Sequence, residues 1–109
     1  MKEIVDKLQE ENLLFKSLKH VPAKELKSRK RINIYLGVDL KKYYGCIFHV
    51  SKKSRMLIKE AEDIIALHKK LEAYNSGTLI KKKYIYIQAP LCSKAKALLE
   101  ERGWVVWLD

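Results

Sequence analysis

Hydrophobic residues along the chain follow two spacings, one typical of helices and one typical of strands. Apolar residues recur every three or four positions in three segments, and they alternate with polar residues or run together in four shorter ones. Amphipathic helices are predicted at residues 1–19, 56–74 and 93–102. Strands are predicted at residues 32–39, 45–51, 84–88 and 104–108. The expected order is helix, strand, strand, helix, strand, helix, strand.

Residues that break regular structure lie between these predicted elements. Pro22 ends the first helix, because the residue before a proline is driven out of the helical region. Residues 23–31 are polar and basic and predict a connector with at most one helical turn. Residues 41–44 predict a turn, so the first two strands form an antiparallel hairpin. Ser54 is the expected N-cap of the second helix, and Asn-Ser-Gly at 75–77 ends it.

The length and the element order predict one small α/β domain over residues 1–109. We expect a mixed sheet made of an N-terminal hairpin and a C-terminal strand–helix–strand unit with parallel strands, with the helices packed on the sheet. No apolar run reaches the roughly 18 residues of a membrane span. Cys46 and Cys92 are too few for a disulfide framework. The expected location is therefore the reducing cytoplasm.

Positive charge is concentrated in the middle of the chain. The formal net charge is +10, and residues 19–55 carry eleven Lys and Arg against two acids. A block of one sign attracts polyanions, whereas a solvated helix face usually mixes both signs. We therefore expect a nucleic acid, DNA or RNA, as the partner, and no membrane. The predicted contact residues are Lys24, Lys27, Arg29, Lys30, Arg31, Lys41, Lys42, Lys52, Lys53, Arg55, Lys81, Lys82 and Lys83.

Aromatic residues are interleaved with these cations, and unpaired bases stack on such rings. Tyr84 and Tyr86 share one face of their predicted strand, next to three lysines. The same rings have a second reading, in which they pack a helix onto the sheet. The residues concerned are Tyr35, Tyr43, Tyr44, Phe48, Tyr84 and Tyr86.

Two short motifs carry a resemblance to a known family. Gly-Val-Asp-Leu at 37–40 ends one strand in an acid, and Ile-Phe-His-Val-Ser-Lys-Lys-Ser-Arg at 47–55 ends the next in lysines. With the surrounding order of helices and strands, this resembles the PD-(D/E)XK nuclease superfamily, which includes restriction enzymes and small Holliday-junction resolvases. The resemblance implies a restriction-endonuclease-like fold. It also implies a catalytic pair of Asp39, holding a cation such as Mg²⁺, and Lys52, acting on the scissile phosphate.

The motif is incomplete. The family's Glu-x-Lys needs an acid at position 50 or 51, where this chain has Val50 and Ser51. The family also has three strands where the pattern predicts two. The acids that remain to complete a site come from helices, namely Glu10, Glu11, Glu60 and Glu62. Asp39 has a simpler reading as a turn residue that caps its own backbone.

Other chemistry finds little support. His20, His49 and His68 have no acid or cysteine at ligand spacing, so no metal site is predicted. The sequence therefore predicts a domain that binds nucleic acid through a basic surface at residues 24–55, without a cofactor and without catalysis. The alternatives are a Mg²⁺-dependent nuclease that uses Asp39, and an interaction module for an acidic protein.

Overall fold

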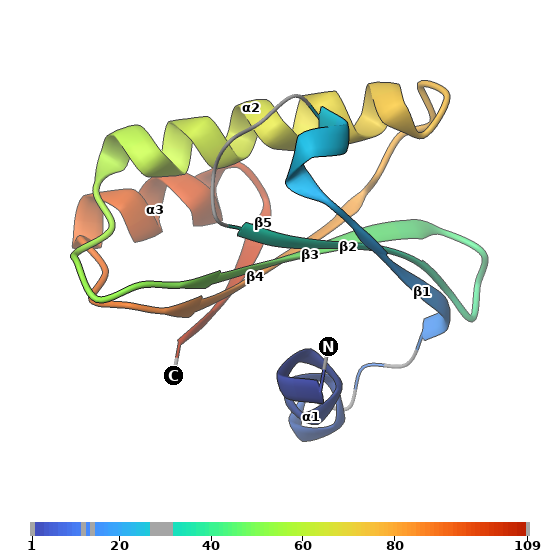
Figure 1. Cartoon of the computed structure of the whole chain (residues 1–109), viewed down its shortest axis with the longest axis horizontal. Helices are drawn as coiled ribbons and strands as arrows, with labels where there is room; N and C mark the ends of the chain where they lie inside the picture. The colour runs from blue at the N-terminus through green and yellow to red at the C-terminus, as the bar shows by residue number, and fades with distance from the viewer. Residues whose placement is uncertain (1, 12, 14, 27–31, 109) are drawn as a thin grey trace.

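A five-stranded mixed sheet with helices on both faces forms the core of the protein (Figure 1). The computed structural model describes residues 2–11, 13, 15–26 and 32–108. In chain order the elements are α1 (Lys2–Glu10), β1 (Phe15–Val21), the 3-10 helix η1 (Ala23–Leu26), β2 (Ile32–Asp39), β3 (Tyr44–Ser51), α2 (Ile58–Tyr74), β4 (Lys82–Gln88), α3 (Ser93–Glu101) and β5 (Trp104–Leu108).

The strands lie side by side in the order of the sequence, β1-β2-β3-β4-β5. The first three strands are antiparallel, and β3, β4 and β5 are parallel. Parallel neighbours need a crossover, and α2 and α3 supply the two crossovers. The predicted α/β class, with a hairpin and a C-terminal parallel strand–helix–strand unit, is confirmed.

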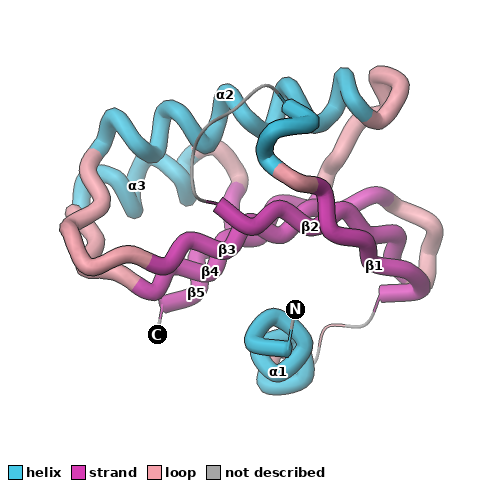
Figure 2. Tube along the Cα trace, in the orientation of Figure 1, coloured by secondary structure: helices cyan, strands magenta, loops and turns pink. Residues whose placement is uncertain are grey.

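Helices α2 and α3 lie on one face of the sheet and α1 lies on the other (Figure 2). The sheet separates two cores of unequal size. The larger core lies under α2 and α3 and takes in Phe48, Ile85 and Trp104 from the sheet. The smaller core lies under α1, where Ile4 and Leu8 of the helix pack on buried aromatic and aliphatic residues of β2 to β5. With both faces covered, β3 is buried from Gly45 to Val50, which explains its nearly unbroken apolar run.

The predicted first helix at 1–19 is wrong in its second half. The helix α1 ends at Glu10, and Phe15–Val21 is a strand that pairs with β2. The pairing register shifts between Phe15 and Ser17, as in a β-bulge. A bulge adds one residue to the alternation, so Phe15 and Leu18 contact the same core although they are three residues apart. This three-residue spacing is also the helical one, and it misled the prediction.

The remaining boundaries differ from the prediction by small amounts. The strands at 32–39 and 104–108 have the predicted limits, while β3 starts one residue earlier and β4 two residues earlier. Ser54 is not the cap of α2, whose N-cap is Leu57 without a side-chain hydrogen bond. The helix is instead preceded by an isolated bridge between Met56 and Leu91, which ties the loop after β3 to the loop after β4.

Candidate nucleic-acid interface

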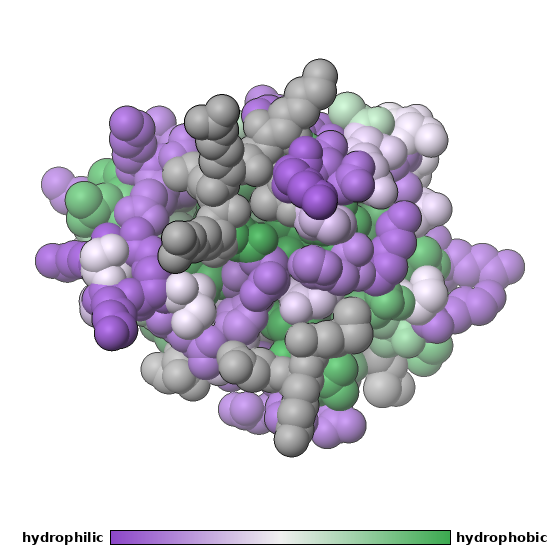
Figure 3. All heavy atoms as spheres, viewed as in Figure 1, coloured by the Kyte–Doolittle hydropathy of each residue, from purple (hydrophilic) through white to green (hydrophobic). Residues whose placement is uncertain are grey.

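Four exposed lysines meet at the end of the sheet where the β2–β3 turn lies. Because β3 and β4 are parallel and Gly45 pairs with Lys82, the start of β4 lies beside the residues that follow the turn. Segments about 40 residues apart in sequence are thereby brought together. We call Lys41, Lys42, Lys81 and Lys82 the hairpin-end cluster. In Figure 3, hydrophilic side chains project at this end of the molecule, next to hydrophobic atoms.

Asp39 organises the turn that carries the cluster. Its Oδ1 accepts hydrogen bonds from the backbone N–H of Lys41 (2.8 Å) and of Tyr43 (2.9 Å). Its Oδ2 lies 2.9 Å from Nζ of Lys82, in an ion pair. The Lys82 ammonium and the two backbone N–H groups lower the pKa of Asp39, and the carboxylate in turn raises the pKa of Lys82. Asp39 therefore has the turn-capping role that its local sequence allows.

The hairpin-end cluster keeps most of its positive charge. Asp39 is the only acid between Glu25 and Glu60, and the chain has no acid between Glu72 and Glu100. Lys82 is neutralised by Asp39, but Lys41 and Lys42 are exposed in the turn. Nζ of Lys81 lies over the Tyr43 ring, 5.7 Å from its centroid. Lys83 points elsewhere, since its ammonium donates to the Arg102 carbonyl at 2.5 Å and lies over Trp104.

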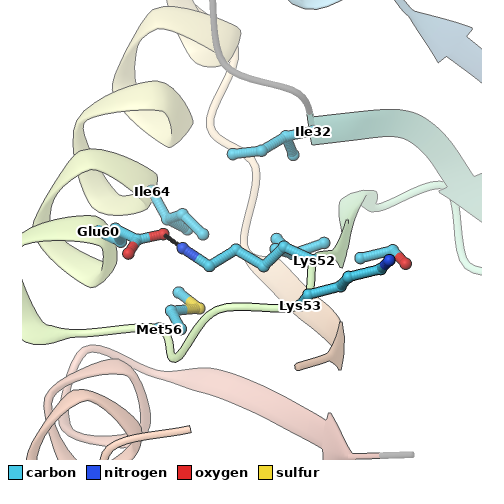
Figure 4. Close-up of a pocket in the computed structure, with 8 residues that line it drawn as sticks. Ile32, Lys52, Lys53, Met56, Glu60 and Ile64 are labelled. Carbon is cyan, nitrogen blue, oxygen red and sulfur yellow. Dashed lines mark hydrogen bonds and ion pairs between the residues drawn. The ribbon is translucent and has the colours of Figure 1, made fainter. Parts of the chain in front are cut away.

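The other predicted cluster lies at the opposite end of the hairpin. Lys52, Lys53 and Arg55 follow β3 beside a cleft of about 460 Å³ between the sheet and α2. Figure 4 shows that the Lys52 side chain reaches across this cleft to form an ion pair with Glu60, while Lys53 points away from Glu60. Lys52 is therefore neutralised within the protein. Lys53 and Arg55 are exposed, so lysines and an arginine follow β3 at this end of the sheet.

The structure does not bring Asp39 and Lys52 together. Asp39 adjoins the turn, whereas β3 ends next to Ile32, at the far end of β2. Seven residues of strand separate the two ends, which is about 20 Å at ~3.3 Å per residue. The candidate catalytic pair is thus split by the length of the hairpin. Among the described residues, no group of three or more His, Cys, Asp or Glu is placed to hold a metal ion.

The helix acids do not complete a site at Asp39 either. Glu10 and Glu11 each lie 3.5 Å from Nζ of Lys7 on their own helix, and Glu60 is paired with Lys52 at the other end of the sheet. Glu62 is exposed on α2, where it borders a shallow groove against α3.

The other predicted contact residues fall into two groups. Lys24 is exposed on η1. Lys27, Arg29, Lys30 and Arg31 lie outside the described residues. Their contribution to binding stays a prediction.

The aromatic residues mostly pack the core, and this decides between the two readings of these rings. Tyr35, Phe48 and Tyr86 are buried, and Tyr44 and Tyr84 are half-buried. Tyr84 stacks on Trp107 with ring centroids 5.1 Å apart, so the expected exposed pair of Tyr84 and Tyr86 does not exist. Tyr43 differs from the rest, because 47% of it is exposed.

A buried polar network under α1 was missed at the level of sequence. His49 is only 6% exposed, its Nε2 lies 2.6 Å from Oε1 of Gln88, and its ring stacks on Tyr86 at 5.1 Å. Nζ of Lys7, a buried lysine of α1, lies 5.2 Å from the centroid of the same Tyr86 ring. The alternation in Tyr-Ile-Tyr-Ile-Gln does place Tyr86 and Gln88 on one face, but the partners come from β3 and α1. The network fixes α1 against the sheet.

Comparison of the chain with protein-family models, with curated proteins and with solved structures gave no match. No helix within the described ranges is long and apolar enough to span a bilayer. The class established here is a small α/β domain with a five-stranded mixed sheet.

Proposed function

We propose that the protein binds nucleic acid, and that the hairpin-end cluster supplies its main contacts to the phosphates. The observation that carries the proposal is the parallel pairing of β3 and β4, which places Lys81 and Lys82 beside Lys41 and Lys42. Lysines act as point charges on phosphates, and such contacts position a protein without reading sequence. The proposal includes no cleavage step.

The conformation of Lys42 supports a role beyond solubility. Its φ is +69°, in the left-handed region that glycine, asparagine and aspartate tolerate best. An ordinary residue there costs roughly 1–2 kcal/mol. If the lysine served only solubility, many other exposed positions could hold it without this conformational cost. A lysine at this position is better explained by a function for its charge.

Protection of a sheet edge is a weaker explanation for these lysines. Lysines often prevent edge strands from pairing with other chains. The edge strands here are β1 and β5, whereas the hairpin-end cluster lies at the ends of the interior strands β2, β3 and β4. Edge protection therefore accounts for Lys16 and Lys19 on β1 but not for the cluster.

The test is the salt dependence of binding to a labelled single-stranded oligonucleotide, measured by fluorescence anisotropy. Each phosphate contact adds about 0.7 to the slope of log affinity against log salt on single strands. We expect Lys41→Gln, Lys42→Gln and Lys81→Gln together to weaken binding at low salt and to lower the slope by about 2.

The matched control replaces three exposed lysines of α2 by glutamine, at Lys59, Lys69 and Lys70. Both triple variants lose the same net charge. A local site predicts that the control keeps the wild-type slope, whereas attraction by overall charge predicts equal losses. Equal losses, or no binding by the wild type at low salt, would contradict the proposal.

A further inference from the structure

The β2–β3 turn presents two apolar side chains to solvent among its lysines. Tyr43 is 47% exposed and Leu40 is 64% exposed. Turn residues are usually polar, because an exposed apolar side chain contributes nothing to the core. Here Leu40 and Tyr43 flank Lys41 and Lys42 in the four residues that join the strands. The turn therefore combines apolar surface with positive charge.

The backbone of this turn is held in one conformation. The N–H of Asp39 donates to the carbonyl of Tyr43 (2.9 Å), and the N–H of Lys42 donates to the carbonyl of Asp39 (3.0 Å). The carboxylate of Asp39 accepts two further backbone hydrogen bonds within the same turn. The turn has already lost its backbone freedom on folding. A ligand therefore does not have to order it, and the lower entropic cost favours tighter binding.

The environment of the Tyr43 ring fits a nucleobase with phosphates on either side. The Lys81 ammonium lies over the ring, at 5.7 Å from its centroid, and Lys41 and Lys42 precede Tyr43 in the turn. Aromatic rings in basic grooves stack on the bases of single strands, and every base has a π face. In a duplex the faces of the bases are covered by their neighbours, so an exposed ring favours unpaired bases.

We propose that Tyr43 is a stacking site for an unpaired nucleobase of single-stranded nucleic acid, whose adjacent phosphates contact Lys41, Lys42 and Lys81. This inference rests on the proposed function and adds the part of the ligand that the lysines do not recognise. The proposed function needs only phosphates, whereas the Tyr43 site needs bases.

Tyr74 provides a matched control for the ring itself. It is 42% exposed at the end of α2 and also has a lysine over its ring, with Nζ of Lys19 at 5.5 Å from the centroid. It lies outside the hairpin-end cluster and shares a shallow groove with Glu25 and Lys70, whose charges are of opposite sign. Replacing Tyr74 removes the same amount of aromatic surface without touching the proposed site.

The experiment compares two oligonucleotides of equal length, one of thymidines and one with abasic sugars. Base stacking on one ring corresponds to about 5- to 150-fold in affinity. We expect wild type and Tyr43→Phe to prefer the thymidine strand by a factor in this range. Tyr43→Ser should lose the preference but keep the wild-type salt slope, and Tyr74→Ser should behave as wild type. Thermal unfolding of each variant checks that the fold is intact.

The outcomes separate the two proposals. Salt-dependent binding of both strands with no preference for bases, or a preference that Tyr43→Ser retains, would overturn the stacking site and leave the phosphate contacts standing. The stacking site would also be overturned if wild type and Tyr43→Ser bound a duplex with equal affinity and this affinity matched the one for the single strand. No salt-dependent binding of either strand would overturn the proposed function itself.

Discussion

At the scale of single residues, Asp39 shows which roles local sequence reveals. Its capping of the turn involves backbone groups two and four residues away, and an Asp before a turn predicts such bonds. Its ion pair with Lys82 was not predictable, because it depends on the parallel pairing of β3 and β4. The resemblance to a nuclease motif points instead to a metal ligand at the same residue. The structure gives the carboxylate three partners within the protein.

The ion pair of Asp39 predicts a pH dependence of stability. The pKa of Asp39 is lowered in the folded protein, from about 3.9 in an unfolded chain. The ion pair therefore stabilises the fold above that value, and the stabilisation is lost as the pH falls through the folded pKa. Asp39→Asn keeps an oxygen for the two backbone N–H groups but removes the charge.

We expect wild type to melt at a higher temperature than Asp39→Asn at neutral pH, and the gap to close in strongly acidic solution. Thermal unfolding monitored by circular dichroism from pH 7 to pH 2 measures this difference in melting temperature. The other carboxylates titrate in both proteins, so the difference isolates Asp39. A gap that stays constant with pH would show that the charge of Asp39 contributes nothing.

At the scale of elements, local patterns predict seven of the nine helices and strands that the described residues form, and β1 and the short η1 are the other two. Strands β2 and β5 have the predicted limits because alternation and apolar runs define them without reference to distant residues. Strand β1 was hidden because its bulge gives Phe15 and Leu18 the three-residue spacing of a helix. A bulge forms only where a neighbouring strand accommodates it, which is a property of the pair of strands.

Gly37 is the residue of β2 that makes room for this bulge. A Cβ at Gly37 would lie 2.8 Å from Cδ1 of Phe15 and 2.9 Å from the carbonyl oxygen of Ser17. The second contact is with backbone, which shifts only if the register of β1 changes. We expect Gly37→Ala to destabilise the protein by about 1–3 kcal/mol in urea unfolding, the range for overpacked sites.

Gly45, the partner of Gly37 in β3, is the control. Its Cβ would have its nearest neighbours at 3.3 Å, namely the Cβ and the carbonyl oxygen of Lys82 and Cε1 of Phe15, against 2.8–2.9 Å at Gly37. The neighbouring atoms need a smaller shift to accommodate a Cβ at Gly45. Replacing glycine by alanine also restricts the unfolded chain, and this stabilisation of ~0.4–1 kcal/mol offsets part of the cost of the shift. A Gly45→Ala variant that loses as much stability as Gly37→Ala would refute the assignment of the bulge to Gly37.

At the scale of the whole molecule, the fold redistributes a charge that the sequence places in one block. Residues 19–55 hold most of the excess, yet the hairpin separates Lys41 and Lys42 from Lys52 and Lys53 by the length of a strand. The β-α-β connection then returns Lys81 and Lys82 to the first pair. Composition predicts a polyanionic partner, but only the sheet topology shows which lysines lie together. We propose that nucleic acid binds at this end of the sheet.

Chemical-shift mapping of backbone amides tests whether nucleic acid binds there. The ¹⁵N-labelled protein is titrated with an unlabelled single-stranded oligonucleotide, and shift changes are recorded residue by residue. We predict the largest changes at residues 39–43 and 81–84, and small changes along α2. Changes concentrated at residues 52–55, on α2 or along β5, with none in the β2–β3 turn, would show that nucleic acid binds elsewhere.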